Sequence, residues 1–81
     1  MPKILEYQGY KFFFFSNEGN PLEPMHIHIR KGGKLAKFWL EPEICLESSF
    51  DFNSSELSFI RNIVFQNKDL FRRKWYEFFE I

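Results

Sequence analysis

The chain has 81 residues and a mass of 9.9 kDa, a length that predicts one domain over residues 1–81. Hydrophobic residues are 44% and charged residues 27% of the chain, which excludes disorder for most of it, and the longest apolar run, Phe12 to Phe15, is far shorter than a membrane helix. Eleven basic and eleven acidic residues leave no net charge, so no global field draws the protein to nucleic acid or to an acidic membrane.

Cys45 is the one cysteine of the chain, so it cannot form an internal disulfide. It has no Cys or His companions at zinc-finger spacing, and we expect neither a structural metal nor a cofactor. Its apolar surroundings predict a buried thiol. The chain begins without an apolar signal segment, and we therefore expect a soluble protein of the reducing cytoplasm, with no membrane partner.

Aromatic residues are the unusual feature of the composition. They make up 21% of the chain, as 12 Phe, 3 Tyr and 2 Trp. A domain of this size buries only about 60% of the surface that its unfolded chain exposes, so the rings cannot all lie inside. The surplus predicts aromatic side chains in a partner interface or an exposed groove.

Two β-hairpins are predicted in the first half of the chain. Residues 4–15 place two aromatic-rich segments around a Gln8-Gly9 turn. After a loop at 16–24, the alternating segments 25–30 and 34–41 flank Gly32-Gly33. The turns predict pairs of Leu5 with Phe12, Tyr7 with Tyr10, Ile27 with Phe38, Ile29 with Ala36, Met25 with Leu40, His26 with Trp39, His28 with Lys37 and Arg30 with Leu35. One face of the second hairpin is then entirely apolar, while its other face gathers histidines, cations and an indole.

The second half of the chain predicts a short strand followed by helix. Pro42 ends the preceding strand, and residues 43–50 can hold a fifth strand. Asn53 and Glu56 have the spacing of a capping box, so a helix begins near Ser54. The apolar phase restarts at Leu70, which predicts a second helix or a bent continuation. Strands first and helices last indicate an α+β fold, in which N-terminal antiparallel hairpins of four to five strands pack against one or two C-terminal helices.

The charges segregate along the chain although they sum to zero. Residues 26–37 contain Arg30, Lys31, Lys34 and Lys37 and no acid, whereas residues 41–56 contain Glu41, Glu43, Glu47, Asp51 and Glu56 and no base. These segments can complement each other within the molecule. Alternatively, the basic segment forms a patch for RNA phosphates or an acidic partner, with Trp39 placed to stack a base.

His26 and His28 are the residues with the clearest catalytic potential. Alternation in a strand points both imidazoles to one face, about 7 Å apart at the backbone. In a metal-independent ribonuclease one ring would act as base and the other as acid, while Arg30 or Lys37 stabilises the phosphorane.

Two other interpretations of the His26-Ile27-His28 strand stand beside catalysis. A metal would need a third ligand, which Glu41 or Glu43 supplies only if the chain curls back, so no metal is assigned. In the structural interpretation, the histidines are polar surface residues that contact Trp39 or a loop. In every case we expect this face to be exposed to solvent, because burying several polar groups together is costly.

A long motif carries a family resemblance. The segments MPKILEYQGYKFFFFSNEGNPLEPMHIHIRKGG and AKFWLEP, the helix start near SSEL and the ending KWYEFF resemble the small prokaryotic family known as domain of unknown function 4160. Met25 departs from it, since the family usually has a second proline there. The positions matching the central motif are Glu23, His26, His28, Arg30, Lys31, Lys37, Trp39 and Glu41.

The resemblance implies a bacterial origin and a gene adjacent to that of another small protein, an arrangement similar to toxin–antitoxin pairs. It implies no established activity. We therefore expect a small intracellular interaction or regulatory protein that binds a small protein partner, its cognate toxin or antitoxin, or a second copy of itself as a homodimer. The alternative, which leaves open whether the protein is an enzyme, is an RNA-binding protein or a ribonuclease toxin that uses His26 and His28.

Overall fold

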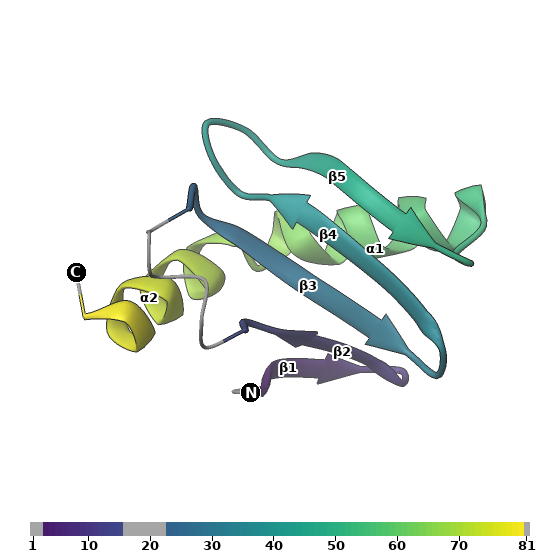
Figure 1. Ribbon diagram of the computed structural model, residues 1–81, viewed down its shortest axis with the longest axis horizontal. Helices are drawn as coiled ribbons and strands as arrows, with labels where there is room; N and C mark the ends of the chain where they lie inside the picture. The colour runs from purple at the N-terminus through teal and green to yellow at the C-terminus, as the bar shows by residue number, and fades with distance from the viewer. Residues whose placement is uncertain (1–2, 16–22, 81) are drawn as a thin grey trace.

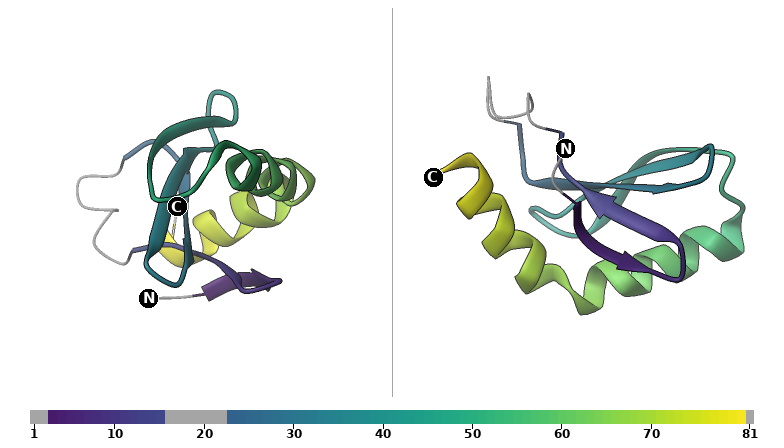
Figure 2. Two further views of the ribbon diagram at one scale, coloured as in Figure 1. Left: turned by 90° about the vertical axis from the view of Figure 1, so that its right-hand side faces the viewer. Right: turned by 90° about the horizontal axis from the view of Figure 1, so that it is seen from below.

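The computed structural model describes residues 3–15 and 23–80. Its elements, in chain order, are β1 (Lys3–Tyr7), β2 (Tyr10–Phe13), β3 (His26–Lys31), β4 (Lys34–Trp39), β5 (Cys45–Phe50), α1 (Ser54–Gln66) and α2 (Lys68–Phe79). The strands form one antiparallel sheet in the order β1-β2-β3-β4-β5 (Figure 1). Both helices lie along one face of this sheet (Figure 2). The predicted α+β fold is confirmed.

The predicted registers of both hairpins are also confirmed. Gln8 and Gly9 have φ of +51° and +85°, the left-handed backbone that a tight two-residue hairpin turn requires. In the second hairpin, Gly32 supplies the positive φ, +61°. The observed pairs include Leu5 with Phe12, Tyr7 with Tyr10, Ile27 with Phe38, Ile29 with Ala36, His26 with Trp39, His28 with Lys37 and Arg30 with Leu35. These registers decide which side chains lie on each face of the sheet.

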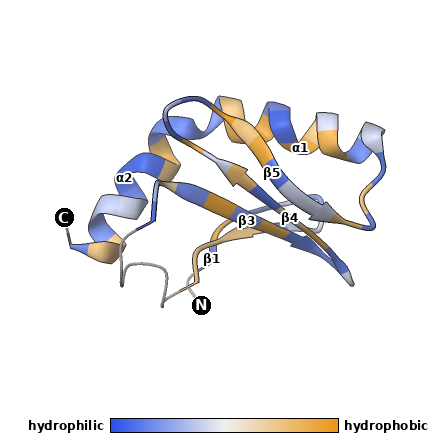
Figure 3. Cartoon of the chain, turned by 45° about the horizontal axis from the view of Figure 1, so that its top comes forward, coloured by the Kyte–Doolittle hydropathy of each residue, from blue (hydrophilic) through white to orange (hydrophobic). Residues whose placement is uncertain are grey.

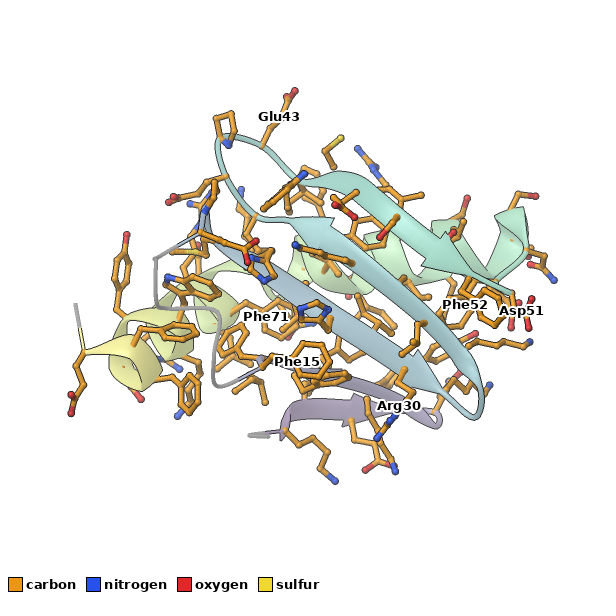
Figure 4. All side chains as sticks on the ribbon, in the orientation of Figure 1. Phe15, Arg30, Glu43, Asp51, Phe52 and Phe71 are labelled. Carbon is orange, nitrogen blue, oxygen red and sulfur yellow. The ribbon has the colours of Figure 1, made fainter. Side chains whose placement is uncertain are left out.

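The main core fills the space between the sheet and the helices. Alternate residues of the strands point into it, and the alternation of hydrophobic and hydrophilic positions is visible along β3 (Figure 3). Phe52 lies toward one end of this core and Phe71 lies nearer its middle (Figure 4). Its fully buried side chains include Phe12, Phe14, Ile27, Ile29, Phe38, Leu40, Ile60, Val64, Phe71 and Trp75. Each side chain of this size contributes about 1.5–3 kcal/mol when it is fully buried.

The helices begin where the sequence predicts. The Asn53 side chain accepts a hydrogen bond from the backbone N–H of Glu56 at 2.8 Å, and the Glu56 carboxylate accepts one from the N–H of Asn53 at 3.0 Å, which completes the capping box. At Asn67 the chain bends and continues into α2, so the helices form a bent rod (Figure 2). Over residues 3–15 and 23–80, neither helix has the length and apolarity needed to cross a bilayer.

β5 forms one edge of the sheet, and all six of its residues are exposed. Its register with β4 shifts at Glu47, because Lys37 pairs with Ser48 while the next residue of β4, Phe38, pairs with Leu46. Cys45 pairs with Trp39 on the face that the helices leave uncovered, and its thiol is exposed. The predicted burial of Cys45 is therefore wrong, because its side chain lies on the edge strand and on the face opposite the helices.

Candidate functional site

The face of the sheet opposite the helices, here called the open face, carries most of the residues singled out from the sequence. Its cross-strand rows are Lys11, Arg30, Leu35 and Phe50; then Phe13, His28, Lys37 and Ser48; then His26, Trp39 and Cys45. Strand alternation places these side chains together because their neighbours point into the main core. The structure thus brings His26, His28, Arg30, Lys37 and Trp39 onto one surface.

His26 is nevertheless fully buried, with 0% of its surface exposed. Its Nδ1–H donates a hydrogen bond to the backbone carbonyl of Pro24 at 2.8 Å. Its ring centroid lies 5.1 Å from that of Trp75 on α2 and 5.6 Å from that of Trp39. The expectation that His26 is exposed to solvent is wrong, because α2 extends to this end of the sheet and its indole packs against the imidazole.

His28 lies in the middle of the open face and is half-buried. Its ring stacks on Phe13 at 5.6 Å and meets the edge of Phe15 at 4.4 Å, while the His26 ring is 5.1 Å away. Figure 4 shows Phe15 over this side of the sheet. The two imidazoles are thus adjacent, as predicted, but only His28 reaches the surface. That geometry does not suit an acid and base pair acting on one phosphodiester, since the buried ring of His26 cannot contact it.

The Lys37 amine links two other residues of the motif. It donates to a carboxylate oxygen of Glu23 at 3.2 Å and lies 4.6 Å from the ring centroid of Trp39. The side chain of Lys37 is 17% exposed, so this pair is partly shielded from water. Lys37 therefore joins the segment before β3 to the sheet.

A second ion pair connects the basic segment 26–37 with the acidic segment 41–56. The Lys34 amine lies 2.8 Å from a carboxylate oxygen of Glu56. This hydrogen bond lowers the pKa of Glu56 and raises the pKa of Lys34. The predicted complementation between the two segments is thus observed at Lys34 and Glu56, whereas Glu23, the partner of Lys37, lies outside the acidic segment.

The two other basic residues of the basic segment, Arg30 and Lys31, contact aromatic rings. Arg30 is exposed 5.8 Å from the Phe13 ring centroid and pairs in register with Lys11, and the Lys31 amine lies 4.4 Å from the Tyr10 ring centroid. Within the described residues, no carboxylate lies within 4.0 Å of these three cations.

Glu41 lies outside this arrangement. It is exposed beyond the end of β4 and makes no described contact with the histidines. In the described part of the chain, no three His, Cys, Asp or Glu side chains are grouped as ligands for a metal ion.

Sequence reasoning missed one part of the open face. Leu35 and Phe50 are opposite each other on β4 and β5, and they are 43% and 61% exposed. With Phe15, His28, Ala36, Lys37, Ser48 and Ser49 they line a hollow of about 270 Å³. The register of β5 would have placed Phe50 on the open face. The bulge at Glu47 breaks the alternation of side chains in β5, so this register does not follow from the sequence pattern.

The fold and the open face define a small α+β protein in which both helices cover the same face of a five-stranded sheet. The chain belongs to the family described as domain of unknown function (DUF4160), whose model matches residues 9–76. A search of the curated proteins and a search of the solved structures each returned no match.

Proposed function

We propose that the protein is the interaction component of a toxin–antitoxin-like gene pair and binds a small protein partner through its open face. The observation that carries the proposal is the exposure of Leu35 and Phe50 as a cross-strand pair. Neither side chain belongs to the main core, in which buried rings fill the space between the sheet and the helices. An apolar pair held on a rigid sheet is typical of a contact surface.

The hollow beside Leu35 and Phe50 strengthens this assignment. Its volume of about 270 Å³ suits one or two large side chains of a partner, and Ser48 and Ser49 on its wall offer hydroxyl groups for hydrogen bonds. Full burial of a Phe or Leu side chain is worth about 1.5–3 kcal/mol. The Leu35–Phe50 pair is thus placed to act as an anchor of an interface.

The test is co-expression with the product of the adjacent gene, followed by size-exclusion chromatography with light scattering. We expect one complex that contains both chains. Phe50→Ser should dissociate it, whereas Tyr76→Ser, which removes a similarly exposed ring from α2 near the other end of the molecule, should not. Separate elution of two monomers would sink the proposal. Self-association of the chain alone, abolished by Phe50→Ser, would instead assign the surface to a homodimer.

RNA binding is the second candidate, and the exposed cations of the open face favour it. Arg30 and Lys11 are exposed and opposite each other on β3 and β2, and no carboxylate of the described residues lies within 4.0 Å of either side chain. The half-buried rings of Phe15 and His28 lie on the same face. Phosphate contacts from such cations and stacking on rings are the usual means of binding single-stranded RNA. Cleavage is not part of this proposal, because His26 is buried.

Fluorescence anisotropy with a labelled single-stranded RNA tests this candidate at several salt concentrations. We expect affinity to fall with salt, and the Lys11→Gln, Arg30→Gln double variant to reduce the slope of log K against log salt by about one to two. Arg73→Gln with Lys74→Gln makes the same charge change on α2 and should leave that slope unaltered. Equal losses in the two double variants would indicate non-specific attraction and contradict an RNA site on the open face.

A further inference from the structure

A second hollow lies away from the open face, where the loop between β4 and β5 meets the bend between the helices. Its volume is about 260 Å³, and it is lined by Pro42, Glu43, Ile44, Arg61, Phe65, Lys68 and Arg72. The proposed partner surface contributes no residue to it.

Cations dominate the wall of this hollow. Arg61 comes from α1, and Lys68 and Arg72 come from α2, at spacings of seven and four residues that place them along one side of the helical rod. In the described residues no carboxylate lies within 4.0 Å of any of them. Glu43 is the acidic residue of the wall, and Figure 4 shows its side chain pointing outward from the loop. The wall of the hollow therefore carries three cations and one carboxylate, and no ion pair within 4.0 Å joins them in the described residues.

The Arg72 guanidinium forms one hydrogen bond to the backbone, and one of its other N–H groups has no acceptor in the described residues. One terminal nitrogen, Nη2, donates to the backbone carbonyl of Leu40 at 3.3 Å, which ties α2 to the end of β4. Its Nε is buried and has no acceptor within the part of the chain that the structure describes. A buried charged donor without an acceptor is unfavourable, and the positive charge of this guanidinium favours an anion in the hollow that Arg72 lines.

Phe65 adds an apolar surface to the same hollow. Its ring is 46% exposed, with the guanidinium of Arg61 at 5.5 Å and the amine of Lys68 at 5.3 Å from its centroid. Cations at this distance from a ring are attracted to its face.

We propose that this hollow is an oxyanion site, which binds a carboxylate or a phosphate group attached to a small apolar or aromatic moiety. Arg72 supplies hydrogen-bond donors in a planar fork, Arg61 and Lys68 supply charge, and Phe65 contacts the apolar part. The site goes beyond the interaction function proposed above and does not depend on it.

The test is a titration of the ¹⁵N-labelled full chain by NMR with inorganic phosphate, acetate and phenyl phosphate, at a constant ionic strength set with chloride. Saturable shifts should centre on residues 42–44 and 61–72, and phenyl phosphate should bind more tightly than inorganic phosphate. Shifts with phosphate and not with acetate identify a phosphate site, whereas shifts with both identify a general oxyanion site. Absence of saturable shifts there with all three probes overturns the proposal.

Variants provide a second readout of the same site. Arg61→Gln with Lys68→Gln should weaken binding at least five-fold, and Arg72→Lys, which keeps the charge and loses the fork, should weaken it as well. Arg73→Gln with Lys74→Gln removes two charges from neighbouring positions outside the hollow and should have no effect. Equal weakening in both double variants would show general charge attraction and overturn the site. The shift map of the unsubstituted chain decides the question even where a variant fails to fold.

Discussion

Replacing His26 by alanine should destabilise the protein as strongly as a change in the apolar core. The imidazole is fully buried, packs against Trp75 at 5.1 Å and donates to the Pro24 carbonyl at 2.8 Å. Truncation of a large buried side chain costs about 2–5 kcal/mol, and loss of the hydrogen bond costs about 1 kcal/mol. Because the imidazole is smaller than a Phe ring, we expect a total of about 2–4 kcal/mol. For a domain of this size the melting temperature should fall by about 10–25 °C.

The measurement is urea unfolding followed by far-UV circular dichroism, which reports the loss of the helices and the sheet. Phe38→Ala, in the main core, should cost about 3–5 kcal/mol. His28→Ala should cost about 1 kcal/mol, because that ring is only half-buried. If His26→Ala unfolds within about 0.5 kcal/mol of the unsubstituted protein at an equal m-value, the packing of His26 against α2 is not a stabilising contact and the reasoning fails.

Three further outcomes follow from local features. Asn53→Ala should lower the free energy of unfolding by about 1 kcal/mol in urea titrations, whereas Asn53→Asp, which keeps the cap, should not. Cys45 should react with a thiol reagent in the native protein about as fast as in urea, and strong protection would contradict its exposure. The bond to Lys34 lowers the pKa of Glu56, so its stabilising effect is complete above the ordinary glutamate pKa of about 4.3 and is lost as pH falls through the lower folded value. The melting temperature of Glu56→Gln should therefore fall less at acid pH than that of the unsubstituted protein, whereas Glu77→Gln should show the ordinary fall. Identical pH profiles for Glu56→Gln and the unsubstituted protein would contradict a stabilising Lys34–Glu56 pair.

The registers of both hairpins could be predicted because two independent signals agree. A turn at Gln8-Gly9 or Gly32-Gly33 fixes which residues are opposite each other, and the alternation of side chains fixes which face is apolar. The start of α1 could also be predicted, because a capping box is recognised from two residues three positions apart. These features depend on short stretches of chain, where sequence and structure correspond most directly.

The burial of His26 and the exposure of Cys45 could not be predicted from local pattern. Alternation places His26 on the open face, which is correct, but Trp75 covers it from the far end of the chain. Such a contact depends on where α2 ends relative to the sheet. Cys45 depends on the bulge at Glu47 and on the absence of a strand beyond β5 in the described sheet. The first error concerns packing between distant elements, and the second concerns the register and the edge position of β5.

The burial of His26 also changes how the family motif should be tested. A double variant that removes His26 and His28 together perturbs the core and the open face at once, so loss of function in it would not distinguish unfolding from loss of a site. His28 is half-buried and reaches the surface. The ion pair of Lys37 with Glu23 holds the segment before β3 against the sheet. Part of the motif therefore maintains the sheet, and part forms its surface. Single substitution of His28, in a protein whose unfolding free energy is measured alongside, is the change whose functional effect can be assigned to the open face.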